Sequence, residues 1–309
     1  MISLRQHAIS LAAVFLALAV GVVLGSSVLS DGLLSGLGND KKELQGQVNT
    51  LQNQVNNKQL QIDSADSFDS AMAGRIVHNA LAERSVIVIT APEATPAEVD
   101  AATKMITESG ASISGRVGLT DSFVDSADAD QLRAAVTNVV PAGTQLSTAA
   151  VDSGSIAGDL LGSVLLLDAE TALPQSTPQE LELALQTLRS GGFIAYDDGT
   201  IAPGQMALIV TGGKSEGEGN QGSVIARFSA AMDSRGAGAV LAGATGSAEG
   251  SGAVAVARSD SALSSHLSTV DNVDRISGQI TMVLALQAEL DDRTGQYGVG
   301  PGATAITVQ

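Results

Sequence analysis

Residues 8–30 form a run of twenty-three amino acids without a charge, most of them Ala, Val, Leu and Gly. A helix rises about 1.5 Å per residue, so this run covers the roughly 30 Å of a bilayer's hydrocarbon core. A cleaved signal peptide would have a shorter apolar stretch, ending at small residues such as those near Gly25. Because the run is long and only Arg5 precedes it, we predict an uncleaved transmembrane helix over residues 8–30.

The charges around this helix bear on its orientation. Arg5 precedes the apolar run, whereas Asp31 and Asp40 follow it, and acidic residues have little influence on topology. Lys41 and Lys42 favour the opposite orientation. An N-terminal segment this short usually stays inside. We therefore expect a single-pass cell-membrane protein with residues 1–7 in the cytoplasm and the bulk of the chain on the extracytoplasmic side.

Two glycines in the apolar run indicate a possible pairing site. Gly21 and Gly25 form a G-x-x-x-G pair, which lets two helix backbones approach closely inside lipid. Glycine is also common in membrane helices that do not pair. The motif alone therefore leaves dimerisation open, and the next segment of the chain adds to it.

Residues 31–66 predict a coiled-coil stalk. Its apolar residues recur at alternating spacings of four and three, with a lysine in one place: Leu44, Val48, Leu51, Val55, Lys58 and Ile62. β-Branched residues at heptad position a and Leu at position d favour two parallel strands. We expect a parallel homodimer. The alternatives are a helix lying on the chain's own globular domain and pairing with a helix of another protein.

The composition excludes several classes of function. The net charge of −17 argues against nucleic acid as a partner, because phosphates would be repelled. The chain has no cysteine, which excludes disulfides, thiolate catalysis and thiolate metal sites. Aromatic residues make up only 2% of the chain, so the core must consist of Val, Leu, Ile and Ala.

Residues 67–294 have the pattern of an α/β domain. Apolar runs at residues 86–89 and 206–210 are typical of strands buried on both faces of a parallel sheet. Strands alternating with helices predict a mainly parallel, Rossmann-like sheet with flanking helices, in one sheet or two lobes. Further strands are expected at residues 112–119, 164–167, 193–196 and 240–242, and helices at 68–84, 97–109, 128–140, 177–189, 223–234 and 275–291. The Gly-rich residues 295–309 are expected to form a flexible tail.

Two loop motifs match catalytic or binding patterns only in part. Residues 217–222 fit G-x-G-x-x-G, but acidic residues in the loop would repel a dinucleotide phosphate. Ser215 lies in a G-x-S-x-G match, with Asp233 and His266 following in the order of a catalytic triad. Residues 216–222 separate this serine from the next predicted helix, whereas in a nucleophile elbow the helix begins directly after the serine. We therefore predict no enzyme activity and no cofactor.

A copper site would need clustered soft ligands, and the sequence scatters them. Copper prefers Cys, Met and His. The three histidines, His7, His78 and His266, lie far apart, and the six methionines occur singly. The pattern predicts no metal site.

Several stretches of the chain resemble the actinobacterial envelope family called mycobacterial copper transport protein B (MctB). They include Ser268-Thr-Val-Asp-Asn-Val-Asp274 and Tyr297-Gly-Val-Gly-Pro-Gly302. The other stretches, in the same order as in the family, are residues 1–10, 16–25 and 239–243. The chain is also similar to the corynebacterial member SteB. That likeness implies an envelope partner resembling SteA and a role in controlling cell-wall hydrolysis at division.

The family resemblance implies copper homeostasis, sometimes through an outer-membrane channel. One apolar helix per chain cannot enclose a pore alone, and the sequence lacks the alternating strands with aromatic girdles of a membrane barrel. Our preferred hypothesis is therefore a non-enzymatic, dimeric envelope scaffold that binds a protein partner. The alternative is a direct copper transport or efflux component.

Overall fold

The chain divides into two units, residues 1–65 and residues 66–309. Strand β1 (Ser85–Thr90) is an inner strand of the sheet in the second, larger unit. The computed structural model describes residues 4–197, 201–213 and 219–309, and the side chains of residue 4 and residues 26–39 are outside the description. Successive residues of β1 point to opposite faces of the sheet. Val86 and Val88 enter one core, whereas Ile87 and Ile89 enter the other. The continuous apolar run is therefore explained by burial on both faces.

The described residues of the larger unit contain one sheet of seven strands in the order β3-β2-β1-β4-β5-β6-β7. All neighbours are parallel except β2 and β3, which are antiparallel. The predicted α/β class with a mainly parallel sheet is confirmed, and the sheet is single. Its other strands are β2 (Ser112–Leu119), β3 (Ile194–Ala195), β4 (Met206–Thr211), β5 (Ala239–Gly243), β6 (Ser268–Val270) and β7 (Gln296–Tyr297).

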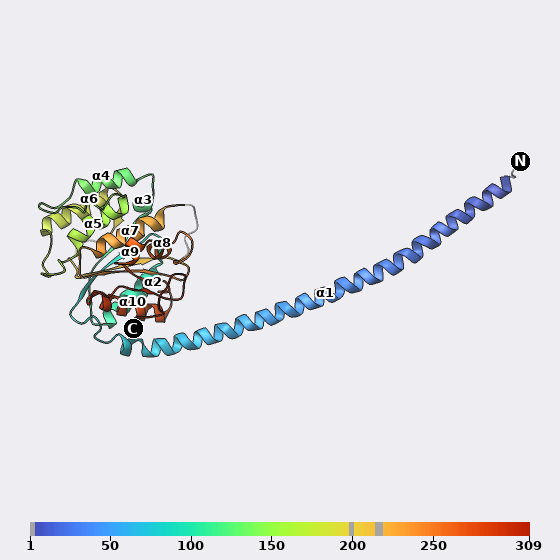
Figure 1. Cartoon of the computed structure of the whole chain (residues 1–309), viewed down its shortest axis with the longest axis horizontal. Helices are drawn as coiled ribbons and strands as arrows, with labels where there is room; N and C mark the ends of the chain where they lie inside the picture. Colours follow the sequence, from blue (N-terminus) through green and yellow to red (C-terminus); the bar gives the residue numbers. More distant parts are fainter. Residues whose placement is uncertain (1–3, 198–200, 214–218) are drawn as a thin grey trace. The chain divides into compact units, whose positions relative to one another are not determined.

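Helices cover both faces of this sheet (Figure 1). On one face lie α2 (Pro96–Glu108), α10 (Ile276–Glu289) and the end of α1 (Leu4–Ile76), which contributes buried Ala73. The other face carries α3 (Asp121–Val124), α4 (Ala129–Thr137), α5 (Ser153–Leu165), α6 (Pro178–Ser190), α7 (Gln221–Asp233), α8 (Ala253–Ser259) and α9 (Ser261–Ser264).

Local signals explain where two helices begin. Thr177 accepts a hydrogen bond from the Glu180 amide at 3.3 Å, and the Glu180 carboxylate accepts one from the Thr177 amide at 2.8 Å. Pro178 occupies the first turn. This capping box confirms the start predicted for α6. Thr95 and Glu98 form the same arrangement at the start of α2.

The strand predicted at residues 164–167 is wrong, because these residues end helix α5 and continue into isolated bridges. A short apolar run does not distinguish a buried strand from a buried helix. Helix α5 is apolar around nearly its whole circumference because it is buried between α7 and neighbouring helices. Three glycines four residues apart let it approach the α7 backbone closely: Gly154, Gly158 and Gly162.

The helix predicted at residues 68–84 is also corrected. Helix α1 ends at Ile76, and turns follow, with Asn79 and Glu83 at positive φ. The last turns of α1 are tied to the domain by an ion pair between Asp66 and Arg275, the residue before α10. Val77, directly after the helix, is buried in the core.

The end of the chain also differs from the expected flexible tail. Residues 296–297 form β7 and pair in parallel with β6. Tyr297 is buried, and Ala305 bridges back to it. Strands β6 and β7 are too short to show a hydrophobic period, which is why the sequence pattern missed them.

The α5–α7 contact gives a prediction for stability. A Cβ built at Gly158 would lie 2.3 Å from the Phe228 carbonyl oxygen, so Gly158→Ala forces two helix backbones apart. We expect this overpacking to lower the free energy of unfolding by about 1–3 kcal/mol. Urea denaturation followed by circular dichroism measures the change. Gly74→Ala is the matched control, because nothing lies within 4 Å of its Cβ and the change should not destabilise. Equal stability of the two variants would contradict the packing described.

Candidate functional site

Helix α1 carries the apolar segment of the first unit. Among the described residues, one segment is long and apolar enough to cross a membrane, Arg5–Gly25, with a mean hydropathy of 2.6. Gly21 and Gly25 both lie in it, with no atom within 4 Å of a Cβ built on either. The described structure thus agrees with an apolar anchor helix, and it leaves the pairing of these glycines untested.

The predicted seam residues lie exposed along α1. Their exposed fractions run from 38% for Ile62 to 63% for Leu44. A shallow hollow of about 670 Å³ lies along this helix and is lined partly by Leu51, Val55 and Lys58. Leu60 is exposed off the seam, at heptad position f. The exposed seam residues are Leu44, Val48, Leu51, Val55, Lys58 and Ile62.

Glutamines flank the seam at every e and g position of its three heptads. With Val48 at position a and Leu51 at position d, all the e and g positions are glutamine. In coiled coils these positions usually carry the charges that select partner and orientation. This seam is therefore flanked by neutral hydrogen-bonding side chains, namely Gln45, Gln52 and Gln59 at e and Gln47, Gln54 and Gln61 at g.

A cavity of about 630 Å³ lies in the second unit between α5, α7, α9 and the loop before α5. Alanines make up much of its apolar lining, and charged groups stand around it. It is lined by Ser147, Ala149, Ala150, Val151, Asp152, Ser155, Asp159, Arg227, Ala230, Ala231, Asp233, Ser234, Ala262, Leu263 and His266.

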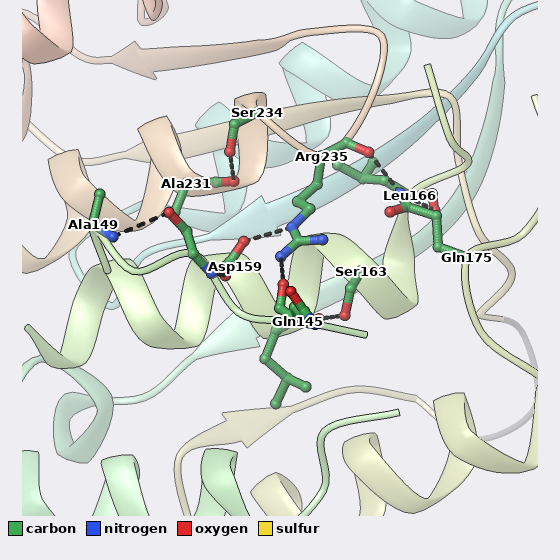
Figure 2. Close-up of polar contacts among 11 residues, drawn as sticks. Gln145, Ala149, Asp159, Ser163, Leu166, Gln175, Ala231, Ser234 and Arg235 are labelled. Atoms are coloured by element: carbon green, nitrogen blue, oxygen red, sulfur yellow. Dashed lines mark hydrogen bonds and ion pairs between the residues drawn. The ribbon is translucent and has the colours of Figure 1, made fainter. Parts of the chain in front are cut away.

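One wall of this cavity is held by a buried ion pair (Figure 2). Arg235, just after α7, donates to the Asp159 carboxylate at 2.5 Å and to the Gln145 carbonyl at 2.8 Å. Asp159 also accepts the Ser147 amide hydrogen bond at 2.5 Å. The Asp159 side chain is only 2% exposed. The pair therefore pins the loop of Gln145 and Ser147 against α5 and α7.

The structure describes two of the three residues that the sequence matched to a catalytic triad, Asp233 and His266. Asp233 and His266 line the same cavity, although they lie on α7 and just after α9. Ser215 and the first two residues of the G-x-G-x-x-G match, Gly217 and Glu218, lie outside the described residues. The structure thus brings two of the three triad candidates together without testing the third.

Two buried carboxyl groups lie at the N-terminal ends of strands β5 and β6. Burial raises the pKa of Asp233 to about 7, against a hydrogen bond from the Ala239 amide. Burial raises the pKa of Glu289 to about 8; hydrogen bonds from Ser268 oppose this rise, and the Asp233 charge adds to it. One oxygen of Glu289, Oε1, is buried without a hydrogen-bond partner. Glu289 is therefore mostly protonated at neutral pH, and Asp233 changes its protonation state near neutral pH.

Soft metal ligands are dispersed in the described part of the chain. Met105, Met206, Met232 and Met282 are at most 5% exposed and pack in the two cores. No group of three or more His, Cys, Asp or Glu side chains placed to hold a metal ion occurs among the described residues. These four thioethers, a ligand type that copper favours, are thus used for core packing.

A second buried ion pair joins two of the stretches that carried the family resemblance. Asp271, which follows β6, accepts hydrogen bonds from Arg258 at 2.6 Å and from the amides of Val299 and Gly300 at 2.8 and 2.9 Å. A Cβ built at Gly298, where φ is +127°, would lie 2.2 Å from Asp271. Glycine is therefore required for this close approach. The pair anchors the loop of residues 297–302 on the sheet.

Comparisons with known proteins extend over the full chain. The family model described as "Copper transport outer membrane protein, MctB" matches residues 1–308. The chain is 48% identical over 315 residues to "Copper transporter MctB" of Mycobacterium leprae (strain TN), covering 100% of this chain and 99% of that protein. It is 45% identical over 312 residues to proteins of the same name in Mycobacterium bovis and Mycobacterium tuberculosis, with the same coverage.

The buried carboxyl groups predict the pH dependence of stability. The pKa values of Asp233 and Glu289 in the folded chain lie above those of unfolded Asp and Glu, near 4, so the folded state binds more protons between these values. Stability should therefore fall as the pH rises from about 5 to about 9. Thermal unfolding across this range measures the trend, and the melting temperature should drop by several degrees.

Neutral isosteres provide the test of cause. Asp233→Asn and Glu289→Gln should each flatten the decline, whereas the exposed control Asp130→Asn should keep the wild-type slope. A melting temperature that rises with pH in the unmodified chain would contradict the assignment.

Proposed function

Because the chain belongs to the MctB family of copper transport proteins, we propose that it is a non-enzymatic envelope protein that supports copper homeostasis as a membrane-anchored dimeric scaffold. In this proposal residues 8–30 hold it in the cell membrane. The α/β domain stands on the extracytoplasmic side and binds an envelope protein partner, a SteA-like one by resemblance.

The observation that carries the proposal is the exposed seam on α1. An isolated helix gains little stability in water unless an apolar face is packed. The seam has apolar residues at five of its six positions, and its neutral flanks add no competing charge. Pairing with a second copy would bury this face, and Gly21 and Gly25 offer a contact in the same helix within the membrane.

Anchoring in one bilayer accounts for the neutral flanks. Charged e and g residues usually set the orientation of a coiled coil. Two copies inserted in the same membrane with the same topology are already parallel, so the seam does not need those charges. The membrane also raises the effective concentration of the second helix, which suits a seam of only three heptads.

Lys58 sets a limit on this pairing. In a parallel homodimer it faces its own copy at a d position, and two like charges there oppose assembly. Such a polar core position fixes register at a cost in stability. The proposed stalk is therefore registered by Lys58 and held together mainly by the membrane and the five apolar positions.

The copper role is proposed to be indirect. The relatives' name is that of a copper transporter, and four methionines of this chain, Met105, Met206, Met232 and Met282, are buried in its cores. An effect on copper would then come from the envelope assembly that the scaffold organises. The second candidate is a direct copper transport component, which the family description favours.

The first experiment maps the seam by disulfide crosslinking. Because the chain has no native cysteine, only the introduced cysteines can form a crosslink. Val55→Cys, at an a position, should form a disulfide with its copy in membranes, whereas Asn53→Cys, at position f, should not. Adding Val48→Asp and Leu51→Asp should abolish the Val55→Cys crosslink and leave the α/β domain folded by circular dichroism. Equal crosslinking with and without the two aspartates would refute the dimer.

Substitution of Lys58 is expected to strengthen the dimer rather than weaken it. Lys58→Leu removes the facing charges and completes the Leu row at d, so the dimer should become more stable. We expect a higher dimer fraction on dilution in detergent, measured by analytical ultracentrifugation. Lys42→Leu, outside the seam, is the control. A weaker dimer in Lys58→Leu would show that the lysine contacts an acidic partner instead.

Copper binding separates the two candidate functions. The full chain in lipid nanodiscs is titrated with Cu(I) and Cu(II) by calorimetry, with empty nanodiscs as the blank. The scaffold proposal expects no site tighter than about 1 μM, or about 8 kcal/mol of binding free energy. Stoichiometric tighter binding that His266→Ala weakens would favour direct copper handling.

A further inference from the structure

The cavity between α5, α7 and α9 has most of its charges cancelled. Asp159 is paired with Arg235 and with the Ser147 amide. Asp152 is paired with Arg227 at 3.3 Å and caps α5. The two ion pairs thus offset the charges of two of the three aspartates that line the cavity.

Two side chains that line this cavity, Arg227 and His266, have N–H groups available as donors. Arg227 has five N–H donors, a side chain 43% exposed, and one ion pair to Asp152. No hydrogen bond of the His266 ring occurs among the described residues, and the ring lines the cavity. Asp233 accepts a hydrogen bond from the Ala239 amide with one oxygen, and burial raises its pKa to about 7, so its negative charge is reduced at neutral pH.

The rest of the lining is small and apolar. Ala230 and Ala231 belong to α7, Ala262 to α9, and Ala149 and Ala150 to the loop pinned by Arg235. Figure 2 shows Ala149 and Ala231 beside the Asp159–Arg235 pair. A volume of about 630 Å³ lies within the usual range of small-molecule pockets, roughly 300–1,000 Å³. Short side chains leave this volume open for the apolar part of a ligand.

We propose that this cavity binds a small organic carboxylate, with its carboxylate on Arg227 and His266 and its compact apolar body on the alanines of α7 and α9. Guanidinium and imidazole groups are suited to hold a planar carboxylate. The loop of residues 145–151 forms the opposite wall, and the buried Asp159–Arg235 pair holds it in place. The site goes beyond the scaffold function, because neither the seam nor the membrane helix takes part in it.

The test compares three probes of nearly one shape and different charge: benzoate, benzamide and benzylammonium. The full chain in lipid nanodiscs is used, and binding is followed by saturation-transfer NMR of the probe with empty nanodiscs subtracted. Benzoate should give the strongest signal, at least several-fold above benzamide. Preference for benzylammonium would overturn the proposal, since the carboxylates would then dominate the site.

Two variants locate the binding. Ala262→Phe should fill the cavity and abolish the benzoate signal, whereas Ala134→Phe on the exposed face of α4 should not change it. Arg227→Gln should weaken benzoate several-fold, and Arg227→Lys should restore part of the affinity. Circular dichroism checks that each variant is folded. A benzoate signal that persists unchanged in Ala262→Phe overturns the assignment of the site, whatever the state of the dimer.

Discussion

The exposed apolar surface of α1 is the constraint on which the rest of the proposed assembly depends. Helices in proteins gain most of their stability from packing an apolar face, and the seam residues find no packing partner among the described residues of the first unit. A bilayer would bury the apolar segment Arg5–Gly25 but not the seam from Leu44 to Ile62. In the proposed assembly a second helix covers this seam, and the neutral glutamines beside it restrict that helix little by charge.

Much of the α/β fold was predictable because local and tertiary signals agree. Three local signals match the structure: the apolar run of β1, the capping box of α6, and Gly110, which has a positive φ just after the end of α2. Helix α5 was missed because it is buried all round, so its sequence has no polar face to reveal the helical period. Strands β6 and β7 were missed because pairing with their neighbours, rather than their own pattern, makes them strands.

The candidate site was less predictable, since its parts come from distant positions. The sequence singled out Asp233 and His266 as members of an ordered pattern, and both line one cavity. It gave no sign of Asp159 and Arg235, which lie 76 residues apart and meet only because α5 packs on α7. The glycines of α5 are a signal that was available: three of them four residues apart mark a helix face where another backbone comes close.

The two buried ion pairs show how this domain uses its charges. A buried pair is costly to desolvate and contributes little net stability unless its hydrogen bonds are complete. Arg235 with Asp159 and Arg258 with Asp271 both meet that condition, and each holds a loop rather than a core helix. Each ion pair holds part of the surface in place: one forms part of a cavity wall, and the other fixes the loop of residues 297–302. A domain built in this way is suited to present rigid surfaces to a ligand or a partner, as the proposed scaffold function requires.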